Sequence, residues 1–244
     1  MGAVFVFHDL TERKAIEQKL IRSERLASIG ELAGILGHDL RNPLSGIRGA
    51  AYYLKRKYAD HLDDEDLAMF ESIDKSINYS NKIINDLLDY STEIYLDCLP
   101  ATPKSLIASA LAAVSLPKNV AVMDTTTNEP TVIVDLDKIS RCFANIIKNA
   151  GEAMSDGGEL QIKSVVEADS VVFVFKDTGA GMSEAILSNI WTPLRTTKAK
   201  GMGFGLAICK RIVEAHGGKI AVESAVEKGT TVTVKLPLNS AANV

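Results

Sequence analysis

A regular spacing of apolar residues in the first quarter of the chain limits what this sequence can fold into. Residues 12–57 are mostly helix formers, interrupted by a few glycines and one proline. Within them, seven residues follow alternating steps of three and four: Leu26, Ile29, Ala33, Leu36, Leu40, Pro43 and Ile47. This spacing is typical of a coiled-coil seam, so it predicts a long helix that packs against other helices.

His38 falls at position f of this heptad register, on the side of the helix furthest from the seam. Asp39 follows it directly, and Asn42 lies one turn further along the same side. A solvated position is ordinary for a surface histidine, so the register alone leaves its role open. Pro43 removes one helical hydrogen bond, which predicts either a simple structural kink or a local loosening of the backbone beside His38.

A second amphipathic helix is predicted after the acidic segment 59–66, and it runs to about Ser91. Its apolar face is formed by Leu67, Phe70, Ile73, Ile77, Ile84, Leu87, Leu88 and Tyr90. Two antiparallel helices alone bury too little apolar surface to be stable. We therefore expect the hairpin to pair with a second copy as a dimeric four-helix bundle.

The rest of the chain alternates between helical and β-rich patterns. Pro100 and Pro103 interrupt the helical pattern, so a linker is predicted over residues 96–102. The predicted helices cover 105–114, 137–154 and 204–215, and the predicted strands cover 120–123, 131–134, 160–166, 171–176, 220–224 and 230–236. The predicted fold class is therefore multidomain α and α+β, with a helical hairpin followed by an α/β sandwich over residues 103–244.

Composition excludes several functional classes. The formal net charge of -4 argues against sequence-independent nucleic-acid binding, which needs clustered cations. Cys98, Cys142 and Cys209 form no C-x-x-C pair, so neither a disulfide framework nor a zinc site is predicted, and a cytoplasmic location is expected. No run of 18 apolar residues is present, so no membrane segment is expected within this chain.

Three motifs in the second domain are suited to binding a nucleotide. The first is N-I-I-K-N-A at residues 145–150, in which Asn145 and Asn149 lie four residues apart and share one helix face. The amide oxygen of Asn149 is a suitable ligand for Mg²⁺, which prefers oxygen atoms and often bridges phosphates. Lys148 is either a cation for a phosphate or an ordinary solvated residue.

The second motif is D-T-G-A-G-M at residues 177–182, directly after an apolar predicted strand. At the end of a buried strand, the carboxylate of Asp177 could accept a hydrogen bond from the exocyclic amine of a base. Gly179 and Gly181 would let the backbone approach the ligand closely. The alternative is an ordinary Asp-turn between a strand and the next element.

The third motif is G-M-G-F-G-L at residues 201–206, which opens a predicted helix. Backbone N–H groups at a helix N-terminus favour phosphate binding. The preceding residues 183–200 include a basic stretch with Arg195, Thr197 and Lys198, and this segment could close over phosphates. A plain solvated loop is the alternative.

Taken in order, these motifs resemble those of the transmitter region of two-component sensor histidine kinases. The motifs that carry the likeness are H-D-L-R-N-P, N-I-I-K-N-A, D-T-G-A-G-M, G-M-G-F-G-L and the terminal G-T-T-V-T-V-K-L-P. The resemblance implies a dimerisation and histidine phosphotransfer domain over residues 23–95 and a gyrase-B-type ATP-binding domain over residues 103–244. Residues 8–14 resemble the exit from a PAS sensor domain, so residues 1–22 are expected to end such a domain in a longer protein and to form a linker helix.

The resemblance also implies roles for individual residues. His38 would be the phosphoacceptor, Asp39 would orient its ring, and Asn42 is either a residue for phosphatase activity or a polar surface residue. Asn149 would be the Mg²⁺ ligand, and Asp177 would read the adenine. The other implied nucleotide contacts are Asn145, Lys148, Gly179, Gly181, Thr197, Lys198, Gly201, Gly203, Gly205, Leu206 and Thr230.

The implied function is autophosphorylation on His38 with ATP and Mg²⁺, followed by transfer to an aspartate of a response regulator receiver domain. The alternative is an ATP-binding dimeric interaction or phosphatase-only module without kinase activity. Gyrase-type relatives carry a general-base glutamate where this chain has Asn145, and an amide cannot take a proton from water. Two departures from the family pattern are Asp39, where glutamate is commoner, and I-W-T-P-L at residues 190–194, which bears on how the lid docks.

Overall fold

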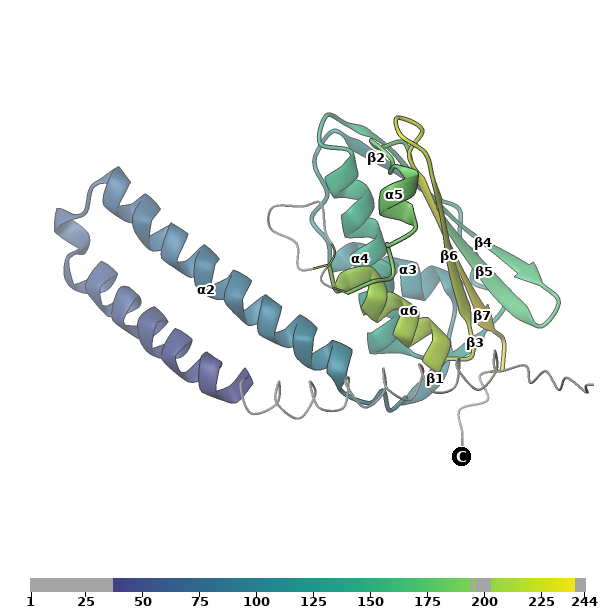
Figure 1. Cartoon of the computed structure of the whole chain (residues 1–244), viewed down its shortest axis with the longest axis horizontal. Helices are drawn as coiled ribbons and strands as arrows, with labels where there is room; N and C mark the ends of the chain where they lie inside the picture. Colours follow the sequence, from purple (N-terminus) through teal and green to yellow (C-terminus); the bar gives the residue numbers. More distant parts are fainter. Residues whose placement is uncertain (1–36, 194, 196–202, 240–244) are drawn as a thin grey trace, which may run out of the picture. The chain divides into compact units, whose positions relative to one another are not determined.

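The structure is a computed structural model that describes residues 37–193, 195 and 203–239 of the 244-residue chain. It divides between Glu93 and Ile94 into two compact units, which are treated separately below (Figure 1). The expected PAS-like segment 1–22 and the first half of the predicted seam lie outside the described residues. No helix among those that are described is long and apolar enough to cross a membrane.

The first unit is an antiparallel helical hairpin. Its first helix is described over residues 37–57 and continues through Pro43. A short turn of 3₁₀-helix, η1 (Ala59–His61), leads to α2 (Asp64–Ser91). The Asp63 carboxylate accepts the N–H of Asp66 at 2.8 Å, and the Asp66 carboxylate accepts the N–H of Asp63 at 3.3 Å. This reciprocal capping explains why the acidic segment starts the second helix.

The two helices of the hairpin pack through both apolar and polar contacts. Ile77 and Ile84 of α2 are buried, and a Cβ at Gly37 would meet the side chains of Ile84 and Leu88 at 3.1 Å. Arg41 donates to Asn85 at 2.6 Å, and Arg48 donates to Asn78 at 2.5 Å. These contacts fix the register of one helix against the other.

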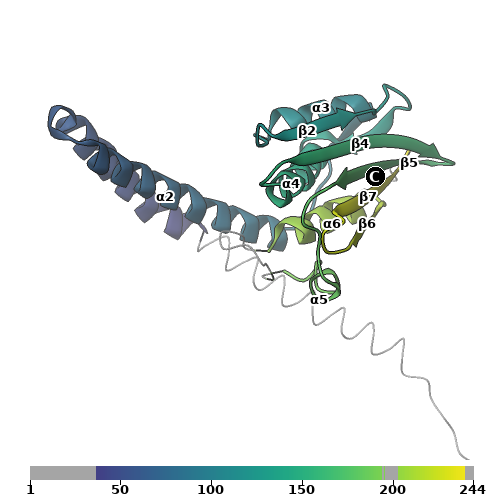
Figure 2. The ribbon, with the colours of Figure 1, turned by 90° about the horizontal axis from the view of Figure 1, so that it is seen from above.

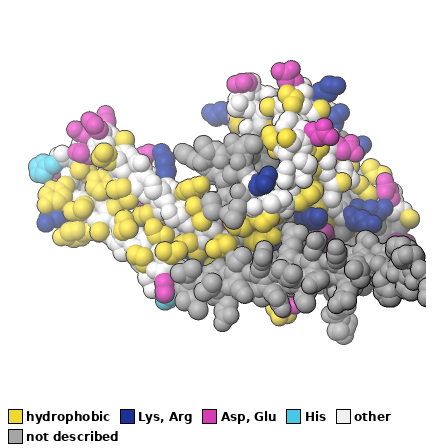
Figure 3. All heavy atoms as spheres, in the orientation of Figure 1, with side chains coloured by type: hydrophobic (Ala, Val, Ile, Leu, Met, Phe, Trp, Pro, Cys, Tyr) yellow, Lys and Arg dark blue, Asp and Glu magenta, His cyan; other side chains and the backbone are white. Residues whose placement is uncertain are grey.

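The predicted seam stays exposed on the single hairpin. Leu40 and Ile47 are 48% and 52% exposed, and other large apolar side chains of both helices are exposed beside them: Leu54, Leu67, Met69 and Ile73. Figure 3 shows hydrophobic side chains gathered along the hairpin. The hairpin therefore does not bury its own apolar stripe, as expected for one half of a larger bundle.

The second unit contains a five-stranded mixed sheet in the order β2-β4-β5-β7-β6. Its strands are β2 (Val120–Asp124), β4 (Gly158–Glu167), β5 (Ser170–Asp177), β6 (Lys219–Ser224) and β7 (Thr230–Pro237). Only the β2–β4 pair of this sheet is parallel. All five strands were predicted within a few residues.

A second, two-stranded sheet corrects the predicted linker at residues 96–102. Strand β1 (Cys98–Ala101) pairs antiparallel with β3 (Val132–Asp135), and Pro100 lies opposite Ile133. The prolines indicated a break in regular structure, but a strand with only one neighbour tolerates a residue that cannot donate from its free edge. The chain thus enters the second unit as an edge strand.

Helices α3 (Pro103–Ala112), α4 (Leu136–Ala153) and α6 (Gly205–Ala215) cover one face of the five-stranded sheet (Figures 1 and 2), and a short helix, α5 (Glu184–Leu187), lies between β5 and α6 in the sequence. Helix α4 contacts both α3 and α6. The Phe143 ring of α4 lies 4.8 Å from that of Phe173 and 5.1 Å from that of Phe175, centroid to centroid. Such tilted aromatic contacts anchor α4 at the centre of the sheet.

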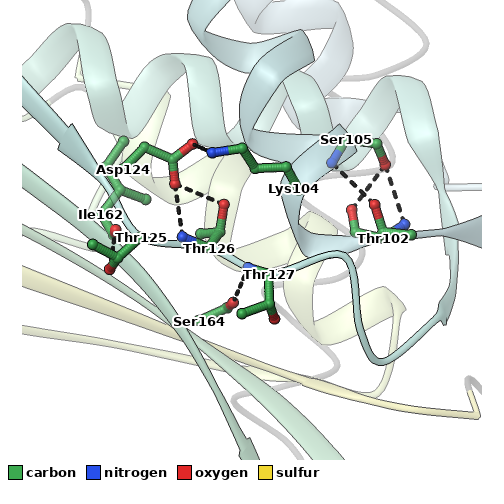
Figure 4. Close-up of polar contacts among 9 residues, drawn as sticks. All are labelled: Thr102, Lys104, Ser105, Asp124, Thr125, Thr126, Thr127, Ile162 and Ser164. Atoms are coloured by element: carbon green, nitrogen blue, oxygen red, sulfur yellow. Dashed lines mark hydrogen bonds and ion pairs between the residues drawn. The ribbon is translucent and has the colours of Figure 1, made fainter.

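A polar network holds the start of α3 against β2 (Figure 4). Thr102 and Ser105 cap each other at the helix start, and Lys104 Nζ contacts the Asp124 carboxylate at 2.8 Å. Burial alone would raise the pKa of Asp124, but hydrogen bonds from Lys104 and Thr126 outweigh it and lower that pKa below its ordinary value. The ionised carboxylate therefore stabilises this corner of the fold.

A buried histidine joins the end of α6 to the start of α4. His216 is 1% exposed; its Nδ1 donates to the Ile212 carbonyl at 2.7 Å, and its Nε2 accepts the Asp135 N–H at 3.0 Å. Asp135 in turn caps α4 by accepting the N–H of Lys138. Because Nε2 is an acceptor, the ring must be neutral, and burial lowers its pKa.

Candidate functional sites

Helix α4 presents the first predicted motif at its C-terminal half. Asn145 and Asn149 are both partly exposed, and their spacing of four residues places them on one face. Lys148 is exposed and forms an ion pair of 3.8 Å with Glu152. Lys148 would have to leave this carboxylate before it could bind a phosphate. The asparagine face of α4 is therefore better placed than Lys148 to contact a bound nucleotide and its cation.

Asp177 lies at the end of β5 and is 6% exposed. Its Oδ1 accepts the N–H of Gly179 at 2.9 Å and the N–H of Thr230 at 3.1 Å. Burial raises the pKa of Asp177, and these two hydrogen bonds lower it only in part. Both donors reach the same oxygen, which leaves Oδ2 without a donor among the described residues and available to accept from a ligand.

The turn after Asp177 requires glycine because main-chain atoms approach it closely. A Cβ at Gly179 would lie 2.6 Å from the Ala153 carbonyl oxygen at the end of α4. Gly181 has a φ of +66°, and its Cβ would lie 1.9 Å from the Ala225 carbonyl oxygen. The two glycines thus bring this turn against α4 on one side and the β6–β7 connection on the other.

The third predicted motif is described in part. Gly203 has a φ of +71°, and a Cβ there would lie 2.4 Å from the Arg195 carbonyl oxygen. Gly205 opens α6, and its Cβ would lie 2.7 Å from Oδ1 of Asn145. The first turn of α6, with Leu206, therefore lies directly beside the asparagine face of α4. The predicted contacts Thr197, Lys198 and Gly201 lie outside the described residues.

Two further residues complete the site: Gly229, which opens the terminal G-T-T-V-T-V-K-L-P motif, and Ser224, which no sequence motif marked. Gly229 has a φ of +79°, and a Cβ there would lie 2.0 Å from the Asp177 carbonyl oxygen. Ser224 Oγ accepts the N–H of Met182 at 2.9 Å and contacts the Gly229 carbonyl and Thr230 Oγ1 at 2.9 Å each. The glycine before Thr230 was the available sequence signal, whereas nothing local marks Ser224.

These elements converge from four parts of the sequence. The carboxylate of Asp177 is joined to the start of β7, and the start of α6 abuts Asn145 on α4. The cluster offers a buried acceptor for a base, amide oxygens for a divalent cation, and a helix N-terminus for phosphate. Among the described residues, no group of three or more His, Cys, Asp or Glu could hold a metal by itself. A cation bound by Asn149 would thus depend on phosphate oxygens for further ligands.

The hairpin carries the second candidate site. The side chains of His38 and Asp39 are 76% and 66% exposed, and Nδ1 of His38 lies 3.3 Å from Oδ1 of Asp39. Asn42 Nδ2 lies 3.5 Å from the same ring nitrogen. An ionised carboxylate only accepts hydrogen bonds, so the contact with Asp39 favours the tautomer that carries its proton on Nδ1. The lone pair of Nε2 then faces solvent.

A groove of about 660 Å³ lies on the same unit. It is lined by residues of both helices: Ser45, Arg48, Gly49, Ala51, Tyr52, Lys55, Phe70 and Asp74. Ser45 and Tyr52 follow His38 at steps of seven, so the groove opens on the helix side that presents His38. Its mixture of aromatic and charged side chains is suited to a protein partner.

Comparison with known proteins gives two family matches. Residues 28–93 match the His Kinase A (phospho-acceptor) domain, and residues 134–240 match the Histidine kinase-, DNA gyrase B-, and HSP90-like ATPase family. The chain is 33% identical over 248 residues to the signal transduction histidine-protein kinase AtoS of Escherichia coli (strain K12), covering 100% of this chain and 40% of that protein. It is 30% identical to sporulation kinase D of Bacillus subtilis (strain 168), covering 97% of this chain and 47% of that protein. The chain thus spans less than half the length of these two relatives.

Solved structures show the same architecture. The crystal structure of full-length ShkA in complex with AMPPNP has a TM-score of 0.74 at 23% identity and covers 87% of this chain and 47% of that one. The structure of histidine kinase ThkA in complex with response regulator protein TrrA has a TM-score of 0.63 at 27% identity and covers 95% and 68%. The predicted fold class, a helical region followed by an α/β ATPase domain, is confirmed.

Proposed function

This chain belongs to the sensor histidine kinases, and from that premise we propose that it transfers the γ-phosphoryl group of ATP to His38 and then to an aspartate of a response regulator. The observation that carries the proposal is the geometry of His38. Its ring is exposed, and its Nδ1 is engaged by Asp39 at 3.3 Å. This contact leaves the Nε2 lone pair free as the nucleophile.

The phosphoryl transfer needs only ATP and His38 as reactants. The Nε2 lone pair of His38 forms a bond to the γ-phosphorus, the bond between that phosphorus and the β–γ bridging oxygen breaks, and ADP leaves with the electron pair. The positive charge that develops on the imidazole is stabilised by the Asp39 carboxylate next to Nδ1. A neutral histidine needs no general base for this attack, so positioning supplies most of the catalysis.

In the ATPase unit, Asp177 would accept the adenine amino group through Oδ2, and its Oδ1 stays held by main-chain donors. Gly203, Gly205 and the N-terminus of α6 would face the phosphates, and Asn149 would hold Mg²⁺ through its amide oxygen. When bound, Mg²⁺ supplies positive charge next to the phosphate oxygens. Asn145 cannot accept a proton from water, which favours transfer to a histidine over ATP hydrolysis.

The hairpin supports three further parts of the proposal. The exposed seam around Leu40 and Ile47 would be buried in a homodimer as a four-helix bundle. The groove on the side of the first helix that presents His38 would receive the response regulator receiver domain. Asn42 lies beside the same ring nitrogen at 3.5 Å, so its amide could orient the water that hydrolyses a phosphorylated receiver domain, which would give phosphatase activity at the same surface.

The test is incubation of the chain with γ-labelled ATP and Mg²⁺. We expect an acid-labile label on the protein that His38→Gln abolishes while ATP binding is retained. His61→Gln is the matched control, because His61 is an exposed histidine of the same hairpin, and it should keep the label. An acid-labile label that persists in His38→Gln would contradict the proposal. ATP binding without any labelling would favour the alternative, a dimeric ATP-binding or phosphatase-only module.

A further inference from the structure

The side-chain amide of Asn145 is held by a buried thiol that the proposed chemistry does not otherwise use. Asn145 Nδ2 donates to Cys209 Sγ on α6 at 3.4 Å. The Cys209 thiol in turn donates to the main-chain carbonyl of Cys142 on α4 at 3.5 Å. Cys142 and Cys209 are each 1% exposed, so water does not compete for the thiol. A chain of hydrogen bonds therefore runs from the candidate nucleotide site into the core between α4 and α6.

The direction of these hydrogen bonds fixes which end of the Asn145 amide meets the sulfur atom. A main-chain carbonyl only accepts, so the single proton of the Cys209 thiol is used in the contact with Cys142. The sulfur atom is then left as an acceptor, and only the NH2 group of Asn145 can donate to it. Turning the amide over would lose this bond and bring two acceptors together in a buried place, which is unfavourable.

Oδ1 of Asn145 is therefore the amide atom that remains for a ligand. Within the described parts of the chain it receives no donor. The start of α6 lies against the same amide, since a Cβ on Gly205 would come within 2.7 Å of Oδ1 and 2.8 Å of Nδ2. Asn149 follows one turn later on the same face of α4. An amide oxygen here suits a divalent cation or a water bound to it, whereas an NH2 group would repel the cation.

We propose that Cys209 is a positioning residue of the nucleotide site, which holds the NH2 group of Asn145 and so keeps the Asn145 amide oxygen turned toward Mg²⁺ bound with ATP. The inference rests on the proposed function, because it concerns the site in which ATP and Mg²⁺ are proposed to bind. Asn149 remains the direct ligand, and Asn145 Oδ1 accepts a hydrogen bond from one of the waters that Mg²⁺ usually keeps. The loss of Cys209 should therefore change only the part of the ATP affinity that depends on Mg²⁺.

The experiment measures ATP affinity by calorimetry with Mg²⁺ and, separately, with EDTA, and compares the two dissociation constants. All variants are made in the whole chain carrying His38→Gln, so that bound ATP is not consumed by transfer. Cys209→Val has a similar volume but no acceptor, and we expect it to reduce the gain in affinity that Mg²⁺ gives by about three- to tenfold, the value of one hydrogen bond. Affinity in EDTA should not change. Cys209→Ser, whose hydroxyl both donates and accepts, should restore the gain.

Cys142→Val is the matched control. Cys142 is as buried as Cys209, and its contact with the Cys209 thiol proton is through the main-chain carbonyl, which the substitution keeps. It should leave the gain from Mg²⁺ unchanged. Cys209→Val added to Asn145→Ala should have no further effect, because the oxygen that Cys209 positions is then absent. In a ¹⁵N–¹H spectrum without nucleotide, the Asn145 NH2 signal, assigned by its loss in Asn145→Ala, should move more in Cys209→Val than in Cys142→Val.

An equal loss of affinity with Mg²⁺ and in EDTA would mean that Cys209 only supports the fold, and it would overturn the inference. A loss in Cys142→Val as large as that in Cys209→Val would overturn it as well, and so would a further loss when Cys209→Val is added to Asn145→Ala. These three results leave ATP binding by the unmodified chain intact, so the proposed function would stand. If the unmodified chain bound no ATP, or bound it no better with Mg²⁺, the proposed use of the site would be contradicted together with this inference.

Discussion

The hairpin and the ATPase unit present their reactive groups in opposite ways. His38 has a side chain that is 76% exposed, with Asp39 and Asn42 beside its Nδ1. Asp177 is 6% exposed and is held by two main-chain donors within a turn that only glycine can form. The proposed nucleotide site is therefore built inside its own unit, whereas the proposed phosphoacceptor is exposed to solvent.

The same contrast holds for the apolar surface. The second unit buries its aromatic core under α4, while the hairpin leaves its seam half exposed. A buried, preorganised site binds its ligand without help from other surfaces. The proposed nucleophile has no such pocket around it, so we expect the selectivity of the hairpin to come from the surfaces that dock around His38.

The largest effect should come from removing the charge of Asp177. Asp177→Asn keeps an oxygen for the two main-chain donors but turns its NH2 group, which can only donate, toward the adenine amine, so a charge-assisted hydrogen bond worth about 1.5–3 kcal/mol is lost. We expect ATP affinity, measured by calorimetry, to fall about ten- to hundredfold. Because burial raises the pKa of Asp177, folding disfavours its ionised form relative to the unfolded chain, so the neutral variant should unfold at the same or a higher temperature.

Asp124→Asn is the matched control, because the pKa of Asp124 is shifted in the opposite direction. Its carboxylate stabilises the fold through Lys104 and Thr126, so its loss should lower the unfolding temperature and leave ATP affinity unchanged. If Asp177→Asn were the destabilised variant and Asp124→Asn the weak binder, the distinction between a binding carboxylate and a structural one would be wrong.

A second prediction concerns the exposed seam. Ile47→Asp places a charge where the bundle is proposed to close, and it should weaken dimerisation by about 1.5–3 kcal/mol per chain, the value of burying one isoleucine. Val166 on β4 is 53% exposed, against 52% for Ile47, which makes Val166→Asp a control of equal exposure. Light scattering across a concentration series should show dissociation only for Ile47→Asp. Equal behaviour of the two variants would mean that the seam is an ordinary surface.

Sequence patterns predicted most of the fold because the hairpin and the sheet rest on local signals. The heptad steps and the acidic capping segment predicted the two helices, and the apolar runs predicted six strands, β2 to β7. Strand β1 was not predicted, because a proline such as Pro100 usually marks a break in regular structure. The segment is a strand because it pairs with β3. A pairing between segments that are distant in the sequence produces no local sequence pattern from which it could be predicted.

The candidate site was predicted in the same uneven way. Asp177 and the glycines stand in short motifs, so they could be found directly. Ser224 could not, because its role depends on the β6–β7 turn that meets the Asp177 turn in space. The contact between Cys142 and Cys209 likewise depends on how α4 packs against α6 across 67 positions of sequence.

The smallest predicted effect is a pH dependence that belongs to the second unit alone. The pKa of His216 is lowered by burial from its ordinary value of 6.5. The unfolded chain therefore binds a proton at this residue before the folded chain does. The stability of the second unit should be complete above about pH 6.5 and should fall as the pH drops below that value.

Hydrogen exchange measured by mass spectrometry between pH 7 and pH 5 locates this effect. After correction for intrinsic exchange rates, protection should fall in α4 and α6, because a protonated His216 can no longer accept the Asp135 N–H that ties the two helices together. Helix α2 should keep its protection. His216→Gln retains an acceptor and does not titrate, so it should flatten the pH dependence of α4 and α6. If protection of α4 and α6 in that variant still fell with pH as in the unmodified chain, groups other than His216 would cause the acid sensitivity. The predicted difference in acid sensitivity between the two units would then lose its basis in His216.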